Sequence, residues 1–88
     1  MKREVVLVEE KTVIIGLHGW DDKLCKETPY ESEKQVEEFF NLVVEKYNAN
    51  DKEFFGVDYD IKENYLAPTK KDILVFWRTV EKRENPLD

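Results

Sequence analysis

The segment DILVFWRTVEK (72–82) carries an aromatic residue and a carboxylate at a spacing that suits ligand binding. If the segment is a β-strand, Trp77 and Glu81 have the same parity and lie on one face, roughly 13 Å apart at about 3.3 Å per residue. A ring and a carboxylate at opposite ends of one site suit a flat cation, through cation–π attraction and charge pairing. The alternative is that Trp77 packs in a core or an interface and Glu81 is a solvated strand end.

The segment EFFGVDYD (53–60) is expected to add side chains to this site. Gly56 lies among aromatic residues, where glycine marks a bulge or a close approach by another group. Asp58 has the same parity and adds negative charge. Tyr59, together with Tyr65 further along, is a candidate hydroxyl donor at the mouth of a cleft.

Trp20 follows a glycine and precedes a polar segment, so its ring is either exposed or a lid over a pocket. With the apolar wall expected from the 53–60 segment, it completes the candidate site. The candidate ligand-binding residues are Trp20, Phe55, Gly56, Asp58, Tyr59, Trp77 and Glu81.

The residue types give little support to catalysis or metal binding. Cys25 is the only cysteine and His18 the only histidine, which excludes an intrachain disulfide and a zinc site. A lone histidine at a strand end is more often structural than catalytic, and nothing in the sequence brings it to the cysteine. Without a nucleophile–base pair, the sequence favours a binding protein over an enzyme, and we expect no catalytic residues, metal or cofactor.

The hydrophobic pattern predicts an α+β fold of order β(β)αββ, with an antiparallel sheet. The first two strand-like runs cover 5–8 and 12–18. The charged residues 9–11 between them are either a hairpin turn or a kink or bulge in one long strand. Two further strands are predicted at 53–60 and 72–82. We expect a single domain over 1–88, with a core at about 4–82 and a tail at 83–88.

One long amphipathic helix is predicted from about 29 to 47, packed on one face of the sheet. The motif TPYE suggests its start: Thr28 as the N-cap, Pro29 at the first helical position and Glu31 completing a capping box. Apolar residues recur at the helical period: Val36, Phe39, Phe40, Val43, Val44 and Tyr47.

The 72–82 strand is apolar on both faces, so one face needs a cover other than the helix. Ile73, Val75 and Trp77 form one set, and Leu74, Phe76 and Val80 form the other. The sequence does not decide which set faces the helix. If Trp77 does, Phe76 takes over the second face and the Trp77–Glu81 site is lost.

Three stretches in this order resemble the GyrI-like effector-binding family of small-molecule-binding modules. They are VVLVEEKTVIIGL (5–17), VEEFFNLV in the predicted helix, and FFGVDYD followed by LVFWRTVEK. The family's domain is a tandem of two strand–helix–strand–strand units, whereas this chain has the length of one. The resemblance therefore implies a half-module that associates as a homodimer about a two-fold axis.

Composition narrows the choice of function. A net charge of −6 argues against a nucleic-acid partner, and no segment is long and apolar enough for a membrane span or a signal peptide. We expect a cytoplasmic protein. Its predicted function is to bind an apolar small molecule, with aromatic or cationic ligands among the options, as a dimer without a DNA-binding domain. The alternative is an acidic protein–protein interaction or inhibitor module that uses the second apolar sheet face.

Overall fold

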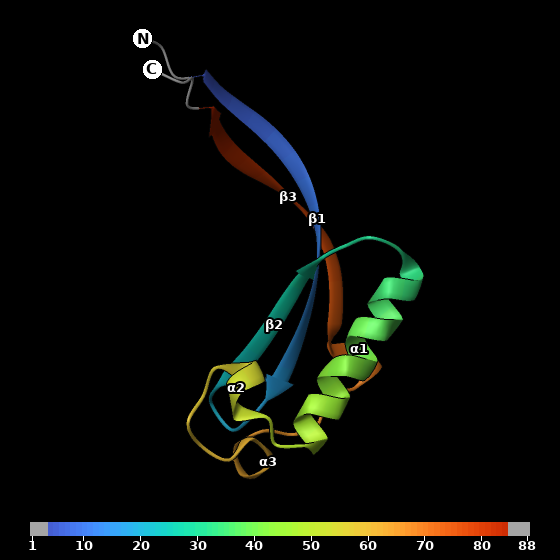
Figure 1. The fold of residues 1–88 in the computed structure, drawn as a ribbon, viewed down its shortest axis with the longest axis vertical. Coiled ribbons are helices and arrows are strands. Elements are labelled where there is room, and N and C mark those ends of the chain that lie inside the picture. The colour runs from blue at the N-terminus through green and yellow to red at the C-terminus, as the bar shows by residue number, and fades with distance from the viewer. Residues whose placement is uncertain (1–3, 85–88) are drawn as a thin grey trace.

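A computed structural model describes residues 4–84 of the chain, and the side chains of residues 7–81. The protein is α+β, with one three-stranded antiparallel sheet in the order β2–β1–β3 (Figure 1). The elements in chain order are β1 (Glu4–His18), β2 (Lys23–Pro29), α1 (Glu33–Asn48), α2 (Lys52–Phe55), α3 (Ile61–Asn64), the 3₁₀ turn η1 (Lys70–Asp72) and β3 (Ile73–Glu84). None of the helices in the described part of the chain is both long enough and apolar enough to cross a membrane.

The first two apolar runs belong to a single strand. β1 pairs with β3 from Glu4↔Glu84 to Ile15↔Ile73 without a shift in register, which excludes both a hairpin turn and a bulge at residues 9–11. The charged residues at this point have partners across the ladder. Glu10 lies 3.7 Å from Arg78, and the Lys11 ammonium lies 5.4 Å from the Trp77 ring centroid.

The segment 23–29, predicted as a polar connection and a helix start, is instead the edge strand β2. Its burial alternates, with Leu24, Lys26 and Thr28 half-buried and the residues between them exposed. This is the period-2 pattern of a strand with one covered face. Pro29 is tolerated because it ends an edge strand.

The helix α1 therefore begins later than the TPYE motif predicted. The hydroxyl of Ser32 accepts from the backbone N–H of Gln35 at 3.1 Å, and the Gln35 side chain accepts from the N–H of Glu31 at 3.3 Å. This exchange satisfies two N–H groups at the helix start, which is the function predicted for Thr28 and Glu31.

The prediction of a strand at 53–60 is wrong, because this segment holds the end of the short helix α2 and the loop that leads to the short helix α3. The carboxylate of Asp51 accepts from Phe54 N–H at 2.9 Å and caps α2, and Asp60 accepts from Glu63 N–H at 2.9 Å and caps α3. Gly56 ends α2 in the left-handed region, at φ 70°, where a side chain is disfavoured. Local side-chain caps thus override the alternation of aromatic residues.

The core lies on one face of the sheet. Its buried residues come from β1, all three helices and the loop after α3: Val13, Ile15, Leu17, Val43, Tyr47, Phe55, Ile61 and Tyr65. Directly paired residues share a face, so Ile73, Val75 and Trp77 have the parity of this helix-covered face. The opposite face, called the open face below, carries Val8, Thr12, Ile14, Leu74, Phe76 and Val80.

The sheet is wide at one end and narrow at the other. β2 pairs only with residues 12–18 of β1, so residues 4–11 pair with β3 alone. The result is a two-stranded arm that extends away from the helices (Figure 1). Trp77 lies at the base of this arm and is 65% exposed, because its strand position is beyond the part of the sheet that the helices bury.

Candidate functional site: an acidic aromatic cleft

A cleft of about 430 Å³ lies at the end of the sheet opposite the arm. It is formed by the turn between β1 and β2, the loop before α3, and α3 with the residue that follows it. The lining residues are Trp20, Asp21, Asp22, Tyr59, Glu63, Asn64 and Tyr65.

The turn between β1 and β2 presents Trp20 and the two aspartates. Gly19 N–H donates to the carbonyl of Asp22 at 3.0 Å and closes the turn. Gly19 also lies against the backbone of Asn64, and a Cβ at this position would collide with the Asn64 carbonyl oxygen. Glycine therefore allows the turn to approach α3 closely, and Trp20 remains 97% exposed at the rim.

Two tyrosines form the inner wall of the cleft. The hydroxyls of Tyr59 and Tyr65 share a hydrogen bond of 2.7 Å, and Tyr47 of α1 donates to the carbonyl of Tyr65 at 2.7 Å. The bond to Tyr59 and the burial of the ring raise the pKa of Tyr65 to about 12, and the negative charge of Asp22 adds to this shift. The Tyr65 hydroxyl is therefore neutral at physiological pH.

Asparagine and aspartate side chains hold α3 in place. Asn50, at φ 51°, accepts from Ile61 N–H at 2.8 Å and donates to the Asp60 carboxylate at 3.3 Å. Asn64 donates to the carbonyl of Asp60 at 2.6 Å. These bonds fix the first turn of α3 and so position Glu63 on the cleft.

A second recess, of about 310 Å³, shares Trp20, Glu63, Asn64 and Tyr65 with the cleft and adds Gly19, Lys62 and Leu66. Trp20 therefore borders both recesses. Leu66 is 74% exposed and gives the second recess an apolar side.

The charge on the cleft has one sign. Its lining includes the carboxylates of Asp21, Asp22 and Glu63 and no lysine or arginine. In the described part of the chain, no three His, Cys, Asp or Glu side chains are grouped to hold a metal ion. Dispersed carboxylates beside aromatic rings suit a cation larger than a metal ion, with its charge spread over several atoms.

The structure brings together two of the seven candidate residues from the sequence. Trp20 and Tyr59 line the cleft. Phe55 is 5% exposed in the core, where its ring makes an edge-to-face contact with Phe54 at 4.9 Å. Gly56 is the left-handed cap of α2 rather than a strand bulge, and Asp58 is exposed in the loop that follows.

Trp77 and Glu81 share a face, as their spacing requires, but they lie on the arm and not at the cleft. Lys11, the cross-strand partner of Trp77, has its ammonium 4.0 Å from the Tyr30 ring centroid and 5.4 Å from that of Trp77. An internal cation therefore occupies the position that a ligand cation would take. Glu81 is exposed opposite Leu7.

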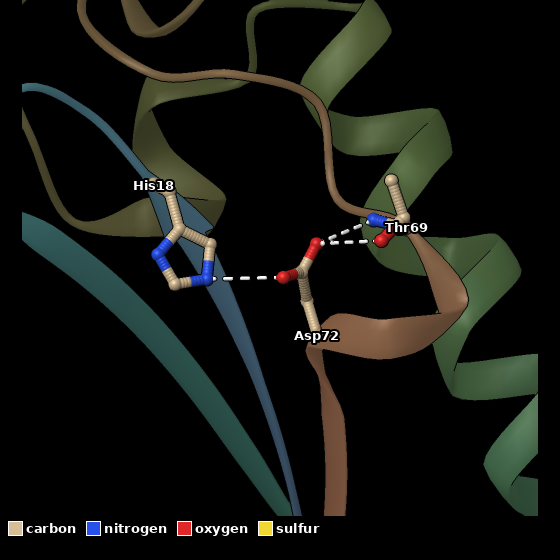
Figure 2. Close-up of polar contacts among 3 residues, drawn as sticks. All are labelled: His18, Thr69 and Asp72. Carbon is tan, nitrogen blue, oxygen red and sulfur yellow. Dashed lines mark hydrogen bonds and ion pairs between the residues drawn. The ribbon is translucent and has the colours of Figure 1, made fainter.

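A polar cluster beside the end of β1 includes the only histidine (Figure 2). His18 Nε2 lies 3.0 Å from Asp72 Oδ1, and Asp72 Oδ2 accepts from the N–H and the hydroxyl of Thr69. These bonds hold the pKa of Asp72 below its usual value, with the Thr69 N–H as the largest cause. The cluster ties the end of β1 to the turn that precedes β3.

Four residues of the cleft were not predicted as ligand-binding residues from the sequence: Asp21, Asp22, Glu63 and Asn64. The pair Asp21–Asp22 directly after Trp20 is a signal for an acidic site beside an indole. Glu63 gives no such signal, since it joins the cleft only because α3 packs against the β1–β2 turn. Tyr65 was a candidate hydroxyl donor from the sequence, and it lines the cleft with Tyr59.

No protein-family model matches this chain, and neither a curated protein nor a solved structure matches it. The resemblance to the GyrI-like family therefore stays a prediction.

Proposed function

We propose that this protein is a small-molecule-binding module that takes a flat organic cation in the cleft beside Trp20. The observation that carries the proposal is the lining itself, which has an exposed indole, two phenol rings and three carboxylates without a basic side chain. Cation–π attraction and charge pairing act on the same ligand in such a site. The ligand class is the one that the sequence predicted from Trp77 and Glu81, although those two residues do not line the cleft.

The indole of Trp20 supplies the stacking surface. At 97% exposure it leaves a large apolar area in contact with water, and a planar ligand stacked on the ring would bury part of this area. The Tyr59–Tyr65 pair holds its hydroxyls in a mutual hydrogen bond, so these rings present a fixed wall. The carboxylates of Asp22 and Glu63 then select for positive charge.

The alternative of an acidic interaction module would use the open face of the sheet. Within the described residues, that face carries Glu10 and Glu27 together with Lys23 and Arg78, so its charges balance. A basic partner is attracted by uncompensated acid, which the cleft offers and this face does not. The charge distribution therefore favours ligand binding at the cleft.

Tryptophan fluorescence and calorimetry test the proposal on a Trp77→Phe variant, which leaves Trp20 as the single indole. N-methylquinolinium is the cationic probe, and 1-methylnaphthalene, which has carbon in place of the ring nitrogen, is its uncharged counterpart of the same shape. We expect saturable binding of the cation, weaker binding of the neutral ring and a decrease in affinity as salt is raised.

Variants that remove carboxylates test which acidic side chains bind the cation. Asp22→Asn combined with Glu63→Gln should weaken binding of the cation by about threefold to tenfold, since each partly exposed charge pair contributes up to about 1 kcal/mol. The matched control is Glu38→Gln, which removes a carboxylate from the exposed surface of α1. The proposal fails if no probe binds saturably, or if a Trp20→Phe variant binds the cation as tightly as the parent protein.

A further inference from the structure

On the open face of the sheet Thr12 is buried, but the apolar side chains around it are exposed or only partly buried. The buried residues of α1, α2 and α3 all belong to the cluster on the other face, together with Ile15 and Leu17 of β1. Leu74 on the open face is 58% exposed, and Phe76, Val8 and Val80 are only partly buried.

Cross-strand pairs arrange this face as a ladder. Val8 is opposite Val80, Thr12 is opposite Phe76, and Ile14 is opposite Leu74. Between the first and second of these pairs, Glu10 faces Arg78 in an ion pair of 3.7 Å. The face is therefore an apolar strip with one acid and one base near its middle.

The arm gives a physical reason to expect a partner. A two-stranded ribbon alone is at best marginally stable in water, because it buries little apolar surface. Here residues 4–11 of β1 and their partners on β3 extend past the third strand. The Val8–Val80 pair belongs to the arm and continues the apolar strip that begins with Ile14 and Leu74. A cover over the strip would stabilise the arm as well as the sheet.

Charge identifies the partner. The chain carries a net charge of −6, so two copies repel each other over most of their surfaces. The described charged side chains on the open face of the three strands are Glu10, Glu27, Lys23 and Arg78, two of each sign. The described part of this face is therefore neutral in net charge, so a second copy can approach it without that repulsion.

We propose that the open faces of two copies pack together about a two-fold axis that passes beside the Glu10–Arg78 pair. The axis places Arg78 of each copy next to Glu10 of the other, so the contact is complementary to itself. The two sheets form the inner layers, about 10 Å apart, and the helices form the outer layers. The ligand cleft lies at the other end of the sheet from the arm and takes no part in this contact.

Sedimentation velocity of the full chain, from low to high micromolar concentration, tests the interface. We expect a species of twice the 10.5 kDa chain mass. Arg78→Glu puts two acids at the axis in each copy and should raise the dissociation constant about tenfold or more. Combining it with Glu10→Arg restores one charge of each sign and should restore the dimer. Lys34→Glu, the same charge change on exposed α1, is the matched control and should leave the mass unchanged.

Disulfide cross-linking tests the position of the axis. In a Cys25→Ser background, Arg78→Cys should form a covalent dimer on oxidation, whereas Thr79→Cys, the next residue but on the opposite face, should not. Equal cross-linking of both variants would place the second copy at the edge of β3 and overturn the proposal. A strict monomer at high micromolar concentration, or an Arg78→Glu variant that dimerises like the parent, would also overturn it. Ligand binding at the cleft is measured separately, so either proposal can fail alone.

Discussion

The imidazole of His18, at the end of β1, lies 3.0 Å from the carboxylate of Asp72, the residue before β3 (Figure 2). The other carboxylate oxygen accepts from Thr69 N–H at 2.6 Å and from the Thr69 hydroxyl at 3.1 Å. Asp72 thus joins a strand end, a 3₁₀ turn and the start of the next strand. This junction holds the loop that leads from α3, and so from the cleft, back into the sheet.

Asp72→Asn should lower the free energy of unfolding by about 1–2 kcal/mol, because it weakens the capping interaction with Thr69 and the contact with His18 at a partly exposed site. Urea denaturation at neutral pH measures the change. Asp58→Asn is the control, since Asp58 is exposed in the loop after α2. Equal stability of the two variants would show that the Asp72 contacts give no net stabilisation.

Stability should decrease in acid, and Asp72 should contribute to the decrease. The pKa values of Asp72 and Asp51 both lie below the ordinary 3.8, chiefly because backbone N–H groups of Thr69 and Phe54 bond to their ionised forms. A lowered folded-state pKa means that the stabilisation is complete above the unfolded pKa and is lost as pH falls through the folded one. Thermal midpoints measured from neutral pH to about pH 2 should fall below about pH 4, and less steeply in Asp72→Asn. An unchanged slope in that variant would contradict the assignment.

Gly19→Ala should destabilise the protein by about 1–3 kcal/mol, because the added Cβ collides with a backbone carbonyl that cannot move freely. The collision is with Asn64 of α3, so the cleft should also be disturbed. Thermal unfolding together with Trp20 fluorescence measures both effects. Gly16→Ala is the control, since its Cβ meets only the flexible end of the Lys23 side chain. A Gly19→Ala variant as stable as Gly16→Ala would mean that the turn does not pack on α3.

Tyr59→Phe should move the pKa of Tyr65 down from about 12, because it removes the hydrogen bond that is the largest cause of the shift. A raised folded-state pKa contributes stability that is complete below the unfolded value of about 10 and is lost as pH rises through the folded one. Ultraviolet absorbance during alkaline titration follows phenolate formation. Tyr30→Phe is the control, because that ring contacts Lys11 on the other side of the protein. Identical titrations of the two variants would rule out the Tyr59–Tyr65 bond in solution.

Hydrophobic periodicity in the sequence predicted the long elements, in which apolar residues recur on one face over many positions. The pattern predicts the strand at 72–82, found as Ile73–Glu84, and the helical repeat of Phe39, Phe40, Val43 and Tyr47. It also established that both faces of the last strand are apolar. These features follow from the local period of the side chains, which does not depend on tertiary contacts.

The sequence predicted the wrong element where one segment is compatible with both a strand and a helix. The alternation in 53–60 fits a strand, but Asp51 and Asp60 cap helical turns that pack Phe55 and Ile61 into the core. The TPYE motif fits a helix start, but Thr28 is the next-to-last residue of β2 because β1 offers a free edge to pair with. Propensity is a weak preference that hydrogen bonding to a neighbouring strand readily outweighs.

Only the tertiary structure decided the location of the candidate site. Trp20 and Tyr59 are 39 positions apart in the sequence, and no period relates them. They meet because the turn held by Gly19 packs on α3, while Trp77 is kept away by its position on the arm and by its contact with Lys11. The sequence determined which residue types were available for a cation site, and packing between distant segments determined which of them share one.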